Sequence, residues 1–237
     1  MSRWIPLESN PEVLNKWATK AGLRNASFAD VYGLEEGLLA MVPQPAKAIV
    51  LLFPITPASE AKRKQEEEEI EKNGQLSLDP TLLWIKQTIS NACGTMGLIH
   101  AIANSDVTIA PMSPLAKFID ECSDKTPDQR AKLLETTPLF GDIHAEAASG
   151  GQSAVPTDLD TNLHFTCFVE APAGRGPESE ATGMRLVELD GRRKGPVDRG
   201  ECTDFLKDVA KVVQEVYIKG GPESLQFSMM SLGPPDQ

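Results

Sequence analysis

A cysteine at the predicted start of a buried helix is the first candidate for chemistry. Cys93 follows Ser90 and Asn91, which are helix-capping residue types, and precedes an apolar run to Ala103, so it is expected in the first turn. Unpaired backbone N–H groups and the helix dipole stabilise a thiolate there and lower its pKa. Gln87 lies upstream, where its amide can point at an oxyanion on a carbonyl that the thiolate attacks. The pattern indicates a nucleophile, although a cysteine at a helix start is also a common buried packing residue.

A thiolate nucleophile needs an acid–base partner, and the chain has three histidines. His100 lies on the same predicted helix as Cys93, roughly 10 Å further along its axis, which is too far to serve the thiol. We expect His100 to be a hydrogen-bonded core residue. His144 lies near the start of a polar stretch, where a catalytic role is disfavoured. His164 remains, in a predicted strand that would present its imidazole rigidly if the strand packs against the Cys93 helix.

Asp190 is the residue that can orient the His164 imidazole. It ends the next predicted strand, and a hairpin of the two strands would bring its carboxylate near the ring. There it would fix the tautomer and stabilise imidazolium. An aspartate before Gly191 is also an ordinary turn residue. Cysteine, histidine and aspartate in this chain order, with an upstream glutamine, form the papain-like arrangement.

The charge balance excludes several classes of partner. The 237 residues include 34 acidic and 23 basic ones, which gives a formal net charge of −11. Binding to nucleic acid or to an anionic membrane needs clustered Lys and Arg, so we expect neither. A partner that presents positive charge is favoured. The longest apolar run, 48–53, is far shorter than the roughly 18 residues of a membrane-spanning helix.

Cysteine spacing indicates a reducing compartment. The four cysteines, Cys93, Cys122, Cys167 and Cys202, form no Cys-x-x-Cys pair, which argues against a zinc knuckle or a thioredoxin-type pair. The N-terminal residues contain no apolar segment of the signal-peptide type. We therefore expect the protein in the cytoplasm or nucleus. We also expect a monomer that uses no metal and no other cofactor.

Hydrophobic periodicity and turn residues predict a single domain that mixes helices and strands. The expected elements are a capped helix over 10–22, a buried strand over 46–53, helices after Ser113 and Thr126, strands over 163–169 and 184–189, a helix over 203–217 and a half-buried strand over 225–230. The charged run 59–72 is expected to be a solvated helix or a mobile connection rather than an interaction tail. The polar stretch 141–161 is expected to be a functional or mobile loop.

At these residues the sequence resembles a known family, the ubiquitin C-terminal hydrolases. The family's active-site signature appears as Gln87, Asn91-Ala92-Cys93-Gly94 and Leu98-Ile99-His100-Ala101. Further matching blocks are Trp4-Ile5-Pro6-Leu7-Glu8, Asp30-Val31-Tyr32-Gly33, Leu51-Leu52-Phe53-Pro54-Ile55, Asn162-Leu163-His164-Phe165 and Glu188-Leu189-Asp190-Gly191-Arg192. Because these blocks keep the family's order from about residue 3 to 232, the resemblance covers nearly the whole chain and is closest to the small single-domain members.

The resemblance implies a deubiquitinating thiol hydrolase with ubiquitin, or a related modifier, as partner. Such an enzyme cleaves thioester, amide and isopeptide bonds after the C-terminal glycine of ubiquitin. It implies Cys93 as nucleophile, His164 as base, Asp190 as the residue that orients it and Gln87 in the oxyanion hole.

The resemblance also implies the fold and the substrate contacts. The fold would be papain-like and α/β (α+β), with a central antiparallel sheet flanked by helices, as one catalytic domain over 1–237. The stretch 141–161 would be a crossover loop that admits only small or flexible adducts. Asp30 would lie near the arginine-bearing ubiquitin tail, with Leu7 and Asn91 as further substrate contacts.

One departure from the family pattern lies between His164 and Asp190. Their interval is 26 residues because the connection 170–183 is longer than the short turn usual in the family. We expect this insertion to bulge outward, since a register shift of one residue would turn Asp190 to the wrong face.

Two alternatives to an active hydrolase remain: a ubiquitin-binding module with little turnover, and a papain-like peptidase of another specificity.

Overall fold

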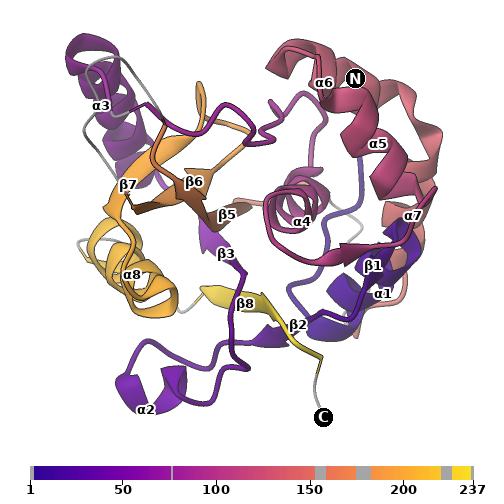
Figure 1. Cartoon of the computed structure of the whole chain (residues 1–237), viewed down its shortest axis with the longest axis horizontal. Coiled ribbons are helices and arrows are strands. Elements are labelled where there is room, and N and C mark those ends of the chain that lie inside the picture. Colours follow the sequence, from indigo (N-terminus) through magenta and orange to yellow (C-terminus); the bar gives the residue numbers. More distant parts are fainter. Residues whose placement is uncertain (1–2, 76, 153–158, 175–182, 220–225, 236–237) are drawn as a thin grey trace.

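A six-stranded antiparallel sheet forms the centre of the molecule (Figure 1). The structure is a computed structural model, and it describes residues 3–75, 77–152, 159–174, 183–219 and 226–235. In spatial order the strands are β2 (Ser27–Asp30), β8 (Ser228–Gly233), β3 (Ala48–Pro54), β5 (Leu163–Pro172), β6 (Met184–Leu189) and β7 (Val197–Glu201). Every neighbouring pair is antiparallel, as the family resemblance implied.

Strand β3 separates two hydrophobic cores because its successive side chains point to opposite faces of the sheet. Ala48 and Val50 belong to the core on one face, whereas Ile49, Leu51 and Phe53 belong to the core on the other. A strand that is buried on both faces has a continuously apolar sequence, which is why this segment could be predicted as a central strand.

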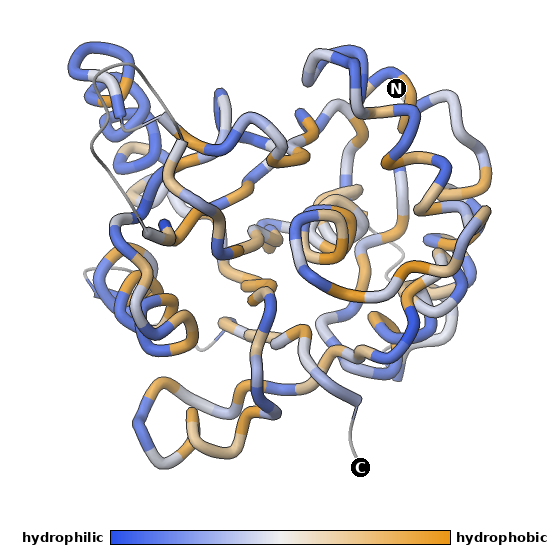
Figure 2. The backbone as a smooth tube through the Cα atoms, viewed as in Figure 1, coloured by the Kyte–Doolittle hydropathy of each residue, from blue (hydrophilic) through white to orange (hydrophobic). Residues whose placement is uncertain are grey.

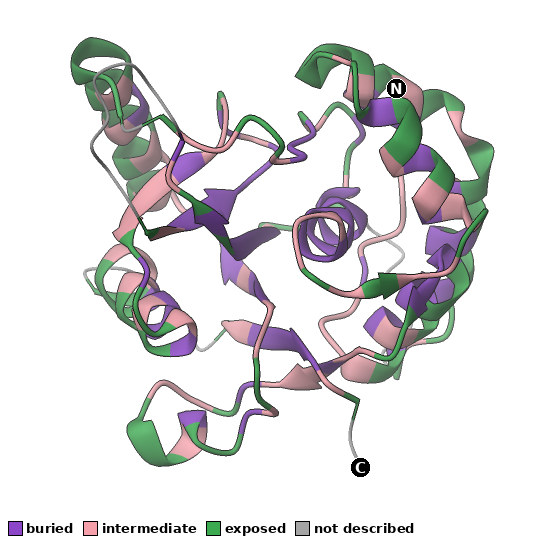
Figure 3. Cartoon of the chain, viewed as in Figure 1, coloured by how far each residue is buried: buried purple, intermediate pink, exposed green. Residues whose placement is uncertain are grey.

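Helix α4 (Cys93–Ala103) packs on one face of the sheet against β3 and β5. Its residues from Cys93 to Ile102 are all buried, in keeping with its apolar sequence (Figure 2, Figure 3). A group of helices covers α4 on the side away from the sheet (Figure 1): α1 (Pro11–Ala21), α5 (Pro114–Cys122), α6 (Pro127–Thr136) and α7 (Pro138–Ala148). A short two-stranded sheet, β1 (Leu23–Arg24) with β4 (Thr108–Ile109), lies beside α1.

The other face of the sheet carries α8 (Phe205–Val212), which continues as the π-helix η1 (Val213–Ile218). Leu206 and Val209 of α8 belong to the second core, together with Phe168 of β5. The remaining helices on this side are α2 (Glu36–Leu39) and α3 (Pro57–Asn73), and α3 lies at the periphery (Figure 1). The predicted helix over 203–217 is therefore confirmed, with a π-helical second half.

Helix starts were predictable from local side-chain chemistry. The Asn10 side chain accepts from the Glu12 N–H (2.8 Å), and Ser113 and Thr126 cap α5 and α6 in the same way. Each of these three helices has proline in its first turn, where the missing N–H costs nothing. The charged run 59–72 is helical, as one of the two expectations had it.

The expectation of a loop over 141–161 is wrong for its first part. Helix α7 extends to Ala148, because Phe140, Ile143 and Ala147 bury one side of it against α1. The Phe140 ring stacks on Trp17 at a centroid distance of 6.1 Å. Residues 153–158 of that stretch lie outside the described residues. Among the described helices, none has both the length and the apolarity needed to cross a membrane.

Candidate active site

Cys93 is the first residue of α4, as predicted, but the helix start is capped differently from the expectation. The N-cap residue is Ala92, which offers no side-chain acceptor. Asn91 has a left-handed backbone (φ 62°), and its amide donates to the carbonyl oxygens of Trp4 (2.9 Å) and Leu159 (3.0 Å). The prediction that Ser90 or Asn91 caps the helix is wrong, because the Asn91 side chain points at these distant carbonyls. The first-turn N–H groups therefore have no capping side chain.

His164 and Asp190 meet as the predicted hairpin of β5 and β6 requires. The His164 Nε2 lies 2.7 Å from the Asp190 Oδ1, and both side chains are almost fully buried. Asp190 is fixed by two further bonds: its Oδ1 accepts from the Arg192 N–H (2.8 Å), and its carbonyl accepts from the Trp84 indole (3.0 Å). With Nε2 directed at Asp190, the other ring nitrogen of His164 is left for the Cys93 thiol, with which His164 interacts.

The connection 170–183 leaves the strand register intact. Strand β5 continues to Pro172, which pairs with Met184 at the start of β6. The pairing of β5 with β6 thus keeps the register that brings His164 to Asp190, as predicted. Residues 175–182 lie outside the described residues.

The electrostatics of the three groups favour a thiolate–imidazolium pair. Burial raises the pKa of Cys93, but the hydrogen bond and charge of His164 outweigh it and hold that pKa below its ordinary value. Burial lowers the pKa of His164, but the charge and hydrogen bond of Asp190 raise it well above the ordinary range. Asp190 has a pKa of about 2, because its contacts with His164 outweigh its own burial. Such a pair can attack an acyl carbon and then protonate the leaving group.

The other two histidines are buried structural residues. His100 Nε2 accepts from the Ile85 N–H (3.0 Å), so its Nδ1–H donates to the Leu189 carbonyl (3.2 Å). His144 bridges the Thr95 hydroxyl (2.9 Å) and the Ile5 carbonyl (2.5 Å). Burial lowers the pKa of each to about 4, so both are neutral. This agrees with the prediction for His100 and with the disfavoured role of His144.

Gln87 lies beside the turn that follows Asp190. Its backbone N–H donates to the Gly191 carbonyl (2.8 Å), and its side-chain Nε2 donates to the Ile89 carbonyl (3.2 Å). One Nε2 hydrogen remains, and the buried Oε1 has no donor among the described residues. Gly191 allows this close approach, since a Cβ there would lie 3.0 Å from the Gln87 Cβ.

The three expected substrate contacts have different surroundings. Leu7 is 5% exposed and covers the helix start, where a Cβ on Gly94 would lie 3.0 Å from it. The Asn91 amide is engaged with backbone carbonyls, as described above. Asp30 is half-buried at the end of β2, and burial raises its pKa. It lies three strands from β5 in the sheet, about 14 Å away at normal strand spacing.

Two contacts of the site had no signal in the sequence. Trp84 holds the Asp190 carbonyl from a segment without regular secondary structure, and Phe53 places its ring edge-on to His164 at a centroid distance of 5.6 Å. Both contacts join segments more than 100 residues apart, so no local spacing reveals them. Within the described residues, no group of three His, Cys, Asp or Glu side chains could hold a metal ion.

Known proteins resemble this chain over nearly its whole length. The family described as "Ubiquitin carboxyl-terminal hydrolase, family 1" matches residues 4–218. The chain is 38% identical to ubiquitin carboxyl-terminal hydrolase 3 of Arabidopsis thaliana, over 97% of this chain and 94% of that protein. It is also 38% identical to ubiquitin carboxyl-terminal hydrolase isozyme L1 of Rattus norvegicus, over 96% of each chain.

A solved structure shows the same fold. The catalytic domain of Trichinella spiralis UCH37, bound to ubiquitin vinyl methyl ester, has a TM-score of 0.72 and 20% sequence identity to this chain. The match covers 99% of this chain and 97% of that one. The α/β fold class predicted from the sequence is confirmed.

Proposed function

The chain belongs to family 1 of the ubiquitin carboxyl-terminal hydrolases, and from that premise we propose that it is a cysteine-type ubiquitinyl hydrolase. Its substrates are thioesters, amides and isopeptides at the C-terminal glycine of ubiquitin. The observation that carries the proposal is the buried array of Cys93, His164 and Asp190, in which a 2.7 Å contact joins the imidazole and the carboxylate.

The proposed reaction begins with the Cys93 thiolate, which attacks the carbonyl carbon of the ubiquitin C-terminal glycine. The new C–S bond pushes the carbonyl electrons onto oxygen. When the tetrahedral intermediate collapses, the bond to the leaving group breaks and the His164 imidazolium gives it a proton. Neutral His164 then removes a proton from water, which attacks the thioester, and the Cys93 thiolate is released with a new ubiquitin carboxylate. Asp190 keeps the ring in one tautomer and stabilises its charged form.

We propose that Gln87 and the Cys93 backbone N–H stabilise the oxyanion. The N–H lies in the uncapped first turn of α4, and the Gln87 Nε2 has one hydrogen beyond its bond to Ile89. Donors fixed before the reaction stabilise charge that develops in the transition state at no reorganisation cost. Removal of one such donor typically costs roughly 10²- to 10³-fold in kcat.

The proposal includes a preference for small or flexible adducts. The connection between α7 and β5 joins the helical half to the sheet, and it returns at Leu159 beside Asn91, two residues before Cys93. We expect this connection to hinder a bulky folded leaving group on its way to the thiol. We expect Asp30 to attract the basic tail of ubiquitin, since it is acidic and lies at the edge of the sheet.

One experiment separates the hydrolase from its alternatives. The purified protein is given ubiquitin with a C-terminal fluorophore, and separately a ubiquitin probe with a C-terminal electrophile. We expect release of the fluorophore and labelling of Cys93, and loss of both in Cys93→Ala, which still binds ubiquitin. Binding without labelling would establish a ubiquitin-binding module instead. Turnover of short peptides without ubiquitin would establish a peptidase of other specificity.

A further inference from the structure

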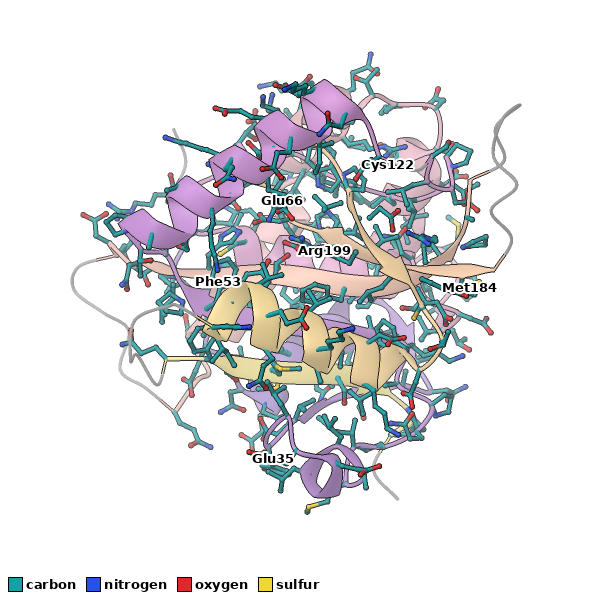
Figure 4. The ribbon with its side chains drawn as sticks, turned by 90° about the vertical axis from the view of Figure 1, so that its left-hand side faces the viewer. Glu35, Phe53, Glu66, Cys122, Met184 and Arg199 are labelled. Atoms are coloured by element: carbon teal, nitrogen blue, oxygen red, sulfur yellow. The ribbon has the colours of Figure 1, made fainter. Side chains whose placement is uncertain are left out.

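Helix α3 is fastened by ionic contacts to the turn that carries Asp190. Three consecutive basic residues of that turn each contact a different glutamate of α3: the pairs are Arg192–Glu60 (2.9 Å), Arg193–Glu66 (2.7 Å) and Lys194–Glu71 (2.5 Å). The only buried residue of α3 is Glu67, so this helix has no apolar face to hold it in place. Figure 4 shows Glu66 and Arg199 between α3 and the sheet.

Glu66 differs from the other two glutamates because its partners are buried. The side chains of Arg193 and Arg199 are 5% and 6% exposed, whereas those of Lys194 and Glu71 are 58% and 59% exposed. Glu66 contacts both arginines, with Arg199 Nη2 at 3.2 Å from its Oε2. A charge pair that is withdrawn from water is screened far less than an exposed pair.

A buried anion, Glu188, joins the partly exposed Glu66 in a balanced cluster of four charges. Glu188 is fully buried, and it accepts from the Arg199 Nε (2.7 Å) and lies 3.3 Å from the Arg193 Nε. We call Glu66, Glu188, Arg193 and Arg199 the Glu66 cluster. Two carboxylates neutralise two guanidinium groups in it. Loss of one carboxylate would leave an uncompensated buried cation, which is costly.

Arg193 is the member of the Glu66 cluster that reaches Asp190. Its backbone N–H donates to the Asp190 carbonyl (3.1 Å), and its charge acts on the Asp190 carboxylate. Its Nε and Nη1 make no aligned hydrogen bond, so charge rather than hydrogen-bond geometry holds its side chain against Glu66 and Glu188. The titratable and charged groups around Asp190 are His164 from β5, Cys93 and His100 from α4, and Glu188 and Arg193 from its own strand and turn.

We propose that Glu66 is a positioning residue for the reaction: by neutralising Arg193 behind the Asp190 turn, it leaves the Asp190 carboxylate to His164. The inference rests on the proposed function. Without Glu66, the uncompensated Arg193 guanidinium competes with the imidazolium for Asp190. His164 then loses its proton at a lower pH than in the native protein.

The test is the alkaline limb of the pH profile, where activity is lost as His164 loses its proton. In Glu66→Gln we expect this limb to move down by about 0.5–1 pH unit. Arg193→Met, which removes the competing cation, should move it up, and the double variant should return near the native position. The matched control is Glu71→Gln, which breaks an exposed pair on the same helix and should leave the limb in place.

Two measurements are made on each protein: kcat/KM for ubiquitin with a C-terminal fluorophore, and the rate at which iodoacetamide alkylates Cys93. The alkylation rate needs no ubiquitin, so it separates the two proposals. If the native protein fails to hydrolyse the ubiquitin substrate but its alkylation profile still shifts in Glu66→Gln, the proposed function is refuted and the effect of Glu66 on the site stands. An unchanged limb in Glu66→Gln, or an equal shift in Glu71→Gln, would overturn the proposal. If Glu66→Gln does not fold, Arg193→Met is the test: an alkaline limb that moves up supports the proposal, and an unmoved limb overturns it.

Discussion

The Asp190→Asn variant isolates what the Asp190 charge does for His164. Asparagine keeps the shape of the side chain and can still accept from the Arg192 N–H, but it carries no charge. In the native protein, burial lowers the pKa of His164, and the Asp190 charge and hydrogen bond more than reverse that effect. With the charge removed, burial is the largest remaining influence. The pKa of His164 should therefore fall below its ordinary value.

The molecule itself indicates how far that pKa will fall. His144 is buried like His164 but has no carboxylate beside it, and its pKa is about 4. His100, on which the Asp190 charge acts without a hydrogen bond, also has a pKa of about 4. If His164 reaches the same value, roughly one molecule in 10³ holds the imidazolium at pH 7. The pKa of Cys93 rises at the same time, because burial is no longer opposed by an imidazolium. We expect kcat/KM at pH 7 to fall roughly 10²- to 10³-fold.

The assay is hydrolysis of ubiquitin with a C-terminal fluorophore between pH 4 and pH 10, with Cys93 alkylation measured in parallel. A histidine with a raised pKa keeps its proton until the pH passes that value, so native activity should persist well above pH 7. The Asp190→Asn profile should lose its alkaline side first. Asp128→Asn removes an exposed carboxylate, paired with Lys86 at 3.1 Å, and serves as the control for net charge. Retention of more than about a tenth of native kcat/KM at pH 7, with an unmoved alkaline limb, would refute the reasoning.

Two further predictions concern stability and substrate capture. In His100→Ala the buried Ile85 N–H and Leu189 carbonyl lose their hydrogen-bond partner. The free energy of unfolding should therefore fall by about 2–4 kcal/mol, and thermal unfolding should show a Tm lower by about 5–10 °C. A decrease in Tm of less than about 2 °C would contradict this bridging role. Cys93→Ala should bind ubiquitin more weakly as salt rises toward about 1 M, where screening acts within about 3 Å. A titration that is independent of salt would mean that the net charge of −11 plays no part in capture.

Features that depend on neighbouring residues were predictable from the sequence. A hydroxyl or amide followed by proline marks a helix start, and Asn10, Ser113 and Thr126 act in this way in the structure. The alternation of β3 between two cores follows from its apolar sequence. The choice of His164 over His100 needed only the rise of a helix per residue, since two turns separate His100 from the thiol.

Features that depend on distant partners were not predictable. Asn91 has the side chain of a capping residue, but it bonds to Trp4 and Leu159, which are 87 and 68 residues away in the chain. Helix α7 was missed because its buried side contains small residues such as Ala147, whose burial depends on α1. The charged run 59–72 indicated solvent contact, yet Glu66 neutralises two buried arginines.

The three histidines show why the base of this site cannot be identified by burial alone. His100, His144 and His164 are 1%, 1% and 2% exposed, so desolvation acts on all three in the same direction and disfavours imidazolium. Two of them donate to a carbonyl oxygen, which compensates only in part. His164 alone contacts a carboxylate, and that carboxylate is available because backbone N–H, indole and imidazole groups converge on Asp190 while Glu66 neutralises the Arg193 guanidinium. The chemistry at Cys93 therefore depends on charges that lie on the opposite side of Asp190 from the thiol.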